Sequence, residues 1–87
     1  MIKLVALSVV DDRTLDLAFS DGSTTRWDAR PILARDTVMT RPLADAAYFR
    51  RAFIEGGALA WPNGLEFSAE ALWRRAAAAG TLQRQAA

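Results

Sequence analysis

The acidic side chains are the first candidates for chemistry in this sequence of 87 residues. Asp11 and Asp12 are adjacent and Asp16 follows closely, so these carboxylates could act as a general acid and base or bind a hard metal ion. Such an enzyme requires two carboxylates to meet in a cleft, drawn from Asp11, Asp12, Asp16, Asp28, Glu55 and Glu66. Aspartate is also a common turn former, and we favour a polar hairpin turn over residues 11–13.

Composition excludes several other kinds of catalytic site. Because the chain has no histidine and no cysteine, it has no Ser/His/Asp triad, no thiol nucleophile, no disulfide and no histidine or cysteine metal site. The phosphate-binding motif G-x-x-x-x-G-K-[ST] is absent, and the only lysine is Lys3. The sequence therefore predicts no enzyme activity, no cofactor and no metal.

Aromatic and basic side chains are candidates for binding rather than catalysis. Trp27, Trp61 and Trp73 could stack on a base or a sugar, but their spacing favours positions in the core. Trp73 is the hardest of the three to bury, because a short helix on a small sheet hides an indole poorly. The candidate partner-binding residues are Arg50, Arg51, Trp73, Arg74 and Arg75.

The distribution of charge argues against nucleic acid as a partner. The formal net charge is +1, and basic and acidic residues are spread over both halves of the chain. A nucleic-acid-binding or regulatory accessory domain is the alternative to a protein-binding role. It requires the side chains of Arg50, Arg51, Arg74 and Arg75 to converge on one face.

Length and hydropathy predict a single soluble domain. The chain is long enough for one core, and we expect a domain over residues 1–80 with a flexible tail over residues 81–87. The apolar start, residues 1–12, is too short for a membrane helix and lacks the features of a signal peptide. We expect a cytoplasmic protein, in agreement with the absence of cysteine.

The turn length of the first hairpin is predicted from the requirement that its large apolar side chains lie on one face of the sheet. A three-residue turn that ends at Gly22 pairs Leu15 with Trp27, whereas a two-residue turn would place Trp27 on the opposite face. The same turn pairs Leu17 with Thr25 and Phe19 with Ser23. We therefore predict a type I turn with a G1 bulge, and a strand over residues 4–10 that pairs on the other side.

The segment WPNG at residues 61–64 predicts a second hairpin of the same kind. A three-residue turn that ends at Gly64 pairs Trp61 with Leu65, and it also places Leu59 opposite Phe67. All four apolar side chains then lie on one face. The two hairpins should present their large apolar groups to a common core.

Residues 28–54 are harder to assign. Pro31 and Pro42 interrupt any long element, so we predict a loop with a short turn at residues 32–33. Asp45 is a candidate N-cap for a helix that extends to about Ile54 and ends at Gly56-Gly57. Phe49 and Phe53 would share one face of this helix.

A second helix is predicted after the second hairpin. Ser68 is its N-cap, Gly80 is its end, and Leu72, Trp73 and Ala76 form its buried face. Together these elements predict an α+β fold. It consists of a small antiparallel sheet of about five strands, a meander plus the 58–67 hairpin, with two short helices packed on one face. Free sheet edges also make a homodimer an expectation.

The chain resembles the bacterial proteins called domain of unknown function 2442. The resemblance covers roughly residues 3–73 and lies in the segments LDLAFSDGSTTRWDARPIL, PLADAAYF, WPNG and AEALW. It implies a small protein without an established enzymatic activity. Because similar proteins are often encoded beside a small toxin-like gene, it also implies an antitoxin-like role. We therefore interpret the chain as a non-enzymatic protein-interaction module that docks through an apolar helix patch or an unpaired sheet edge.

Overall fold

A computed structural model describes residues 1–84 of the chain as a small α+β fold. The first antiparallel sheet has the order β1-β2-β3 and consists of Leu4–Asp11, Thr14–Phe19 and Thr24–Asp28. The second has the order β4-β5-β6 and consists of Phe53–Glu55, Ala58–Ala60 and Glu66–Phe67. The helical segments are α1 (Arg30–Ala34), the 3₁₀ helix η1 (Arg41–Ala44), α2 (Ala46–Phe49) and α3 (Ala69–Ala79). The predicted fold class is confirmed.

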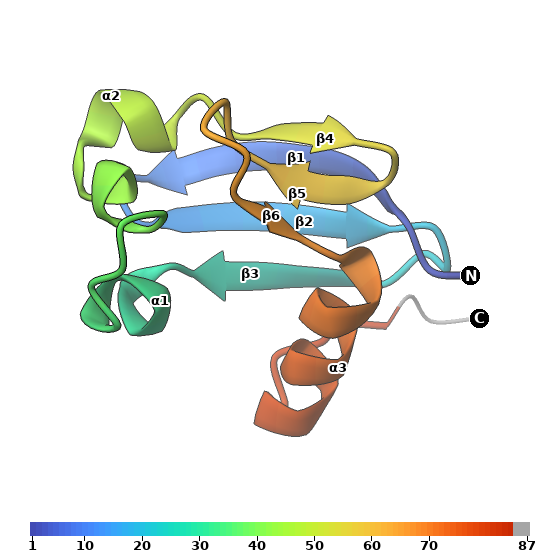
Figure 1. Cartoon of the computed structure of the whole chain (residues 1–87). Helices are drawn as coiled ribbons and strands as arrows, with labels where there is room; N and C mark the ends of the chain where they lie inside the picture. Colours follow the sequence, from blue (N-terminus) through green and yellow to red (C-terminus); the bar gives the residue numbers. More distant parts are fainter. Residues whose placement is uncertain (85–87) are drawn as a thin grey trace.

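The second sheet packs on one face of the first. Figure 1 shows β4 and β5 lying across β1 and β2, with α1, η1 and α2 at one end and α3 beside β3. The core between these layers contains large side chains from both sheets and from the helical segments, namely Leu15, Leu17, Phe19, Leu43, Phe49, Leu59, Trp61 and Leu72. The other face of the first sheet has no layer over it among residues 1–84.

The three-residue turn of the first hairpin is confirmed. Leu15 pairs with Trp27 and Leu17 with Thr25. The N–H of Gly22 donates to the carbonyl of Phe19 over 3.0 Å, and Gly22 has a φ of 89°. Trp27 is half-buried and packs against the core, as the pairing requires. The strand before this hairpin, β1, pairs with β2 as predicted.

The second hairpin has the predicted register as well. Leu59 pairs with Phe67, and the N–H of Trp61 donates to the carbonyl of Leu65 over 3.0 Å. Gly64 closes the turn at a φ of 91°. Trp61 is 1% exposed, and the rings of Trp27, Phe49 and Phe67 surround it at centroid distances of 5.9–6.2 Å. Trp61 is therefore part of the core, whereas Pro62, Asn63 and Gly64 of the same corner are exposed.

The expectation of one continuous sheet is wrong, because the strands form two sheets of three. An edge-to-edge sheet would have left its whole apolar face to the short helices. Packing the hairpin face to face instead buries Leu59 and Trp61 against Leu15 and Leu17. The hydrophobic effect thus favours two small layers over one wide sheet.

The helix predicted to reach Ile54 ends at Phe49. Asp45 is its N-cap, as predicted, and accepts a hydrogen bond from the N–H of Ala47. The next residues form β4, in which Ile54 pairs with Leu59, and Phe53 is 40% exposed instead of sharing the buried face of Phe49. Gly56 and Gly57, with φ of 58° and 83°, form a hairpin turn between β4 and β5.

Two further segments are more ordered than predicted. The loop expected over residues 28–44 contains two short helical segments, each with its proline in the first turn, where the missing N–H has no intrahelical partner. The tail expected from residue 81 is paired at its start, because Gln83 forms an antiparallel bridge with Thr24. Of that predicted tail, residues 85–87 lie outside the described residues.

Candidate interaction surface

The helix α3 carries three of the five candidate partner-binding residues. Ser68 caps it by accepting a hydrogen bond from the N–H of Ala71 over 3.1 Å, and Gly80 ends it at a φ of 75°. Leu72 and Ala76 are buried against the core. Because this face is fixed by packing, the side chains of Trp73, Arg74 and Arg75 lie at its border or on its outer side.

Trp73 fastens α3 to the rest of the fold. Its indole N–H donates to the Asp21 carboxylate over 3.1 Å, and the guanidinium of Arg84 lies 5.0 Å from its ring centroid. The Asp21 carboxylate also accepts hydrogen bonds from Ser23, which are the largest cause of its lowered pKa. Trp73 is therefore half-buried between the β2–β3 turn and the C-terminal segment, and it offers a partner only part of its ring.

Arg74 and Arg75 differ in whether they have a counter-charge. The guanidinium of Arg74 contacts the Glu70 carboxylate over 2.6 Å, one helical turn away. Arg75 forms no ion pair or side-chain hydrogen bond within residues 1–84. Arg75 is therefore the arginine of this helix with a charge still available to a partner.

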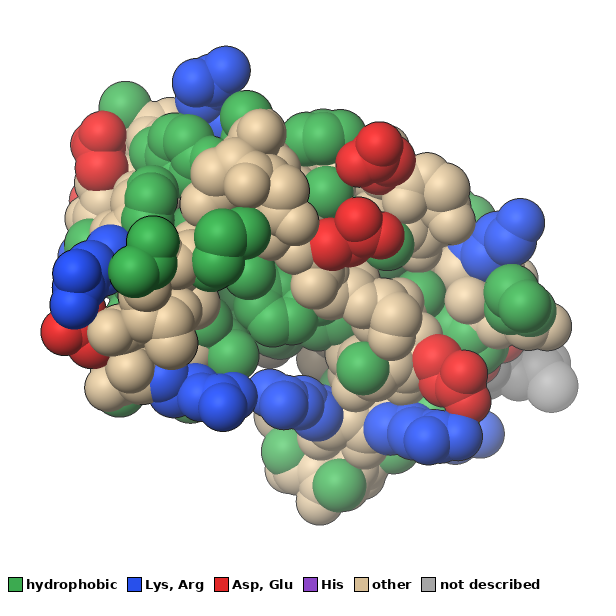
Figure 2. Space-filling model, in the orientation of Figure 1, with side chains coloured by type: hydrophobic (Ala, Val, Ile, Leu, Met, Phe, Trp, Pro, Cys, Tyr) green, Lys and Arg blue, Asp and Glu red, His purple; other side chains and the backbone are tan. Residues whose placement is uncertain are grey.

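Arg75 lines a groove between α3, β3 and α1. We call this the β3–α3 groove, and its volume is about 230 Å³. The side of α3 contributes Leu72, Ala76 and Ala79, the side of α1 contributes Pro31 and Ile32, and β3 contributes Thr25, Arg26, Trp27 and Asp28. Thr81, after α3, also lines the groove, and its carbonyl accepts a hydrogen bond from the Thr25 hydroxyl over 3.2 Å. Figure 2 shows basic side chains along the lower rim of this view, on either side of the notch next to α3. The groove thus has an apolar floor, and its charged lining residues are Arg26, Asp28 and Arg75.

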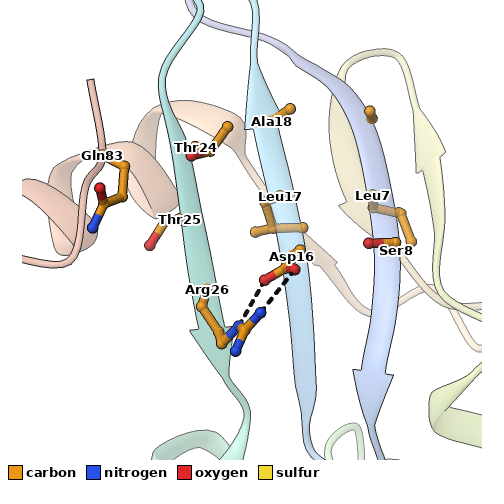
Figure 3. Close-up of a pocket in the computed structure, with 10 residues that line it drawn as sticks. Leu7, Ser8, Asp16, Leu17, Ala18, Thr24, Thr25, Arg26 and Gln83 are labelled. Atoms are coloured by element: carbon orange, nitrogen blue, oxygen red, sulfur yellow. Dashed lines mark hydrogen bonds and ion pairs between the residues drawn. The ribbon is translucent and has the colours of Figure 1, made fainter. Parts of the chain in front are cut away.

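One wall of the β3–α3 groove is the edge of the first sheet. Thr24 exchanges two backbone hydrogen bonds with Gln83, of 2.8 and 2.7 Å, on the side of β3 away from β2. Because peptide groups alternate between the two sides of an antiparallel strand, the N–H and C=O of Arg26 face this same side. Figure 3 shows the Gln83 segment beside Thr24 and no strand beside Arg26. In the described chain this stretch of β3 has no strand partner.

The remaining two candidate residues lie elsewhere. Arg50 and Arg51 follow α2, at the end of the molecule opposite α3 in Figure 1. The Arg50 guanidinium lies 3.3 Å from the Asp12 carboxylate, and that of Arg51 lies 5.8 Å from the ring centroid of Tyr48. The structure therefore divides the predicted set. The convergence of four arginines that nucleic-acid binding requires is not present in the part of the chain described.

A second hollow lies on the uncovered face of the first sheet. It has a volume of about 630 Å³ and is lined by small and polar residues such as Ser8, Ala18 and Thr24. Figure 3 shows Asp16 and Arg26 across its floor, joined by two hydrogen bonds of 2.9 and 3.1 Å. Because the two charges neutralise each other, this face offers a ligand neither a free acid nor a free base.

Three of the six carboxylates proposed for acid–base chemistry are paired with arginines. Asp16 binds Arg26, Asp28 binds Arg30 over 2.7 Å, and Asp12 contacts Arg50. The bound arginine is the largest cause of the lowered pKa of Asp16 and of Asp28, whereas a backbone hydrogen bond from Arg13 is the largest cause for Asp11. A general acid needs a raised pKa, so these groups lack that property.

Metal binding through these carboxylates has no geometric support either. Asp11 and Asp12 do line a common hollow, but Arg13, Arg30 and Arg50 line it too. No three acidic side chains of residues 1–84 gather at a distance suited to one metal ion. A hard cation would meet three positive charges at this hollow.

The edge of β3 is a feature that the sequence analysis did not assign. The sequence indicates an unpaired sheet edge as a docking surface in general, without locating it. The register of the first hairpin was a usable signal, because it already determines which peptide groups of β3 point away from β2. What the register leaves open is where α3 and Gln83 lie.

Comparisons with known proteins bear on the family. Within residues 1–84, no helix combines the length and the apolar character needed to cross a membrane. No curated protein and no solved structure matches the chain. A family model described as a protein of unknown function, DUF2442, matches residues 4–78, which include every strand and nearly all of α3. The chain therefore belongs to the DUF2442 family.

Proposed function

We propose that this protein is a non-enzymatic interaction module that binds another small protein in the cytoplasm, in the manner of an antitoxin. The observation that carries the proposal is the β3–α3 groove. Within residues 1–84, its strand edge has no partner at Arg26 and its Arg75 has no counter-charge. Exposed strand edges and apolar grooves are common docking surfaces for proteins.

Two further considerations support this proposal over an enzyme. Asp16 and Asp28 are each held by an arginine that lowers the pKa of the carboxyl, and a general acid needs a raised pKa. The antitoxin-like role itself comes from the resemblance to proteins encoded beside small toxin-like genes. The cytoplasmic location agrees with a chain that has no cysteine.

The experiment that tests this function is co-expression with the protein encoded by the adjacent gene. A tagged form of this chain should pull down that protein, and calorimetry should give a saturable 1:1 complex. If the neighbour arrests growth, co-expression should relieve the arrest. Two folded chains that fail to associate would contradict the proposal.

The same samples test the nucleic-acid alternative. Titration with duplex DNA and with single-stranded RNA at 50 and 200 mM salt should show no saturable binding. The alternative would gain support from an affinity that falls steeply with salt and also falls when Arg50 or Arg51 is replaced by alanine.

A further inference from the structure

The β3–α3 groove has the properties of a site for strand addition. We propose that it binds an extended, acidic segment of a partner protein, which pairs with the outer edge of β3 and places a carboxylate beside Arg75. This inference rests on the proposed function, because it assumes that the chain works by binding another protein. It names the segment and the chemistry that the site would take.

The backbone of β3 supplies the first part of the site. Beyond the bridge between Thr24 and Gln83, the N–H and C=O of Arg26 point into the groove without a strand partner in the described chain. An added strand would continue the ladder that Gln83 begins. Such main-chain hydrogen bonds give affinity in strand addition, and pockets for alternate side chains give specificity.

The shape of the groove favours a peptide over a small molecule. Its volume of about 230 Å³ is below the ~300–1,000 Å³ typical of ligand pockets. It runs between a strand edge and the side of α3, with Leu72 and Ala76 at its floor. An extended segment could pair with β3 and place one apolar side chain on this floor, since side chains of a strand alternate between its two faces.

The charge of the groove determines which sign of charge a partner segment should carry. Two charged residues other than Arg75 line the groove, and both are paired: Arg26 with Asp16, and Asp28 with Arg30. Arg75 alone among the groove residues has no counter-charge within residues 1–84. A partner carboxylate would complete the pair, with the bidentate geometry that arginine offers.

The other edge of the first sheet is less suited to strand addition. β1 has register irregularities between Leu4 and Ala6 and between Val9 and Asp11. Bulges of this kind disrupt the ladder and protect an edge from pairing. The N–H of Leu4 is also already bonded to the carbonyl of Gly57 over 2.8 Å.

A second copy of this chain fits the groove less well than an acidic partner. The strand it would insert, Thr24–Asp28, carries one carboxylate, and that carboxylate is held by Arg30 at 2.7 Å. Arg75 would therefore stay without a counter-charge. The proposal predicts a monomer by sedimentation, and a dimer that Arg26→Pro abolishes would overturn the choice of partner.

A proline substitution tests the strand pairing. Arg26→Pro removes an N–H that faces the groove and not β2, a position where an edge strand tolerates proline. Arg26→Ala is the matched control, because it also breaks the ion pair with Asp16 but keeps the N–H. With the adjacent-gene protein, affinity should fall about tenfold or more for Arg26→Pro and stay within about twofold for Arg26→Ala. Equal affinity of two folded variants would overturn the proposal.

A charge reversal at Arg75 tests the proposed contact with a carboxylate of the partner. This test does not depend on whether the proline variant folds. Arg75→Glu should weaken binding about tenfold, because it places like charges together. Arg74→Glu is the control, since Arg74 lies on the same helix but pairs with Glu70 and does not line the groove. Equal loss in the two variants would indicate a general charge effect and would contradict the proposed contact.

A synthetic peptide separates failure of this proposal from failure of the proposed function. The probe is a capped pentapeptide, Thr-Val-Glu-Val-Thr, with the lysine analogue as control, titrated into the ¹⁵N-labelled chain. The amide signals of Arg26 and Asp28 should shift, with the glutamate peptide at least about threefold tighter. No shift at these amides would overturn strand addition even if the neighbour binds elsewhere. If the peptide shifts these amides but the adjacent-gene protein does not bind, the strand-addition site is supported and that protein is excluded as its partner.

Discussion

The indole N–H of Trp61 donates a hydrogen bond to the backbone carbonyl of Phe49 over 3.0 Å inside the core. This bond joins the W-P-N-G corner of the second hairpin to the end of α2. The corner is tied again at its tip, where the side chain of Asn63 donates to the carbonyl of Met39 and its backbone N–H donates to the hydroxyl of Tyr48. The W-P-N-G segment is therefore a structural junction.

Replacing Trp61 should cost far more stability than replacing Trp73. Trp61→Phe removes a buried hydrogen bond and leaves the Phe49 carbonyl with only the 3.3 Å bond from Ala52. With the lost volume, we expect a decrease of about 2–3 kcal/mol in the free energy of unfolding, measured in urea.

Trp73→Phe is the matched control, because it removes an indole hydrogen bond of similar length, 3.1 Å, that is open to solvent. Its cost should be below about 1 kcal/mol, since water replaces an exposed partner. Similar costs for the two variants would contradict the assignment of Trp61 to the core junction.

Alanine substitutions at two adjacent glycines should differ in effect. Both Gly56 and Gly57 have positive φ, so each substitution should cost about 1–2 kcal/mol from backbone strain. A Cβ at Gly57 would also lie 2.9 Å from Cβ of Lys3, whereas one at Gly56 meets nothing within 4 Å. Gly57→Ala should therefore unfold at a lower urea concentration than Gly56→Ala, and the reverse order would show that the start of β1 does not lie against this turn.

Stability should decrease in acid. The pKa of Asp16 lies below its ordinary value of 3.8, chiefly because its carboxylate is hydrogen-bonded to Arg26. A carboxyl whose pKa is lowered by folding stabilises the fold above the unfolded pKa. This contribution is lost as the pH falls from about 4 through the folded pKa, because the unfolded chain binds the proton more readily.

Asp16→Asn tests this contribution. The wild type should lose stability between about pH 4 and pH 2, and the variant should lose less over that range, in urea unfolding curves at stepped pH. Because the side chains of Arg26 and Asp16 are 65% and 44% exposed, solvent screens the pair and the difference should be small at neutral pH. Arg26→Ala should flatten the curve in the same way, and a variant curve parallel to that of the wild type would contradict the pairing.

Much of the first sheet and both tight turns follow from the sequence. In each of the two hairpins only one turn length lets the large apolar side chains face the core. These side chains are Leu15 and Trp27 in the first hairpin and Trp61 and Leu65 in the second. Ser68 and Gly80 likewise mark the ends of α3 by residue type alone. These features depend on local chemistry and on alternation, which a single sequence contains.

The second sheet shows where this reasoning fails. Phe49 and Phe53 have helical spacing, yet Ile54 alternates with its neighbours as in a strand, and Gly56-Gly57 is a hairpin signal. Packing in the core decides between helix and strand for these residues, because only a strand places Ile54 opposite Leu59. Tertiary packing therefore overrides a local pattern that is consistent with both structures.

The candidate surface was predictable only in part. Residue type and helical spacing indicate that Arg74 and Arg75 are exposed, but Arg74 is neutralised by Glu70 and Arg75 is not. Whether Arg75 faces an open strand edge depends on where α3 packs and on the bridge between Thr24 and Gln83. These contacts join residues far apart in the sequence, so neither periodicity nor composition contains them.

Amide hydrogen exchange at β3, followed by NMR with and without the adjacent-gene protein, tests the central claim most directly. In the free chain, the N–H of Arg26 should exchange fast, while those of Thr25 and Trp27, which face β2, should be protected. Binding should slow exchange at Arg26 by at least about tenfold and leave Thr25 nearly unchanged. An Arg26 amide that is already protected in the free chain, or that exchanges equally fast in the complex, would contradict strand addition at this edge.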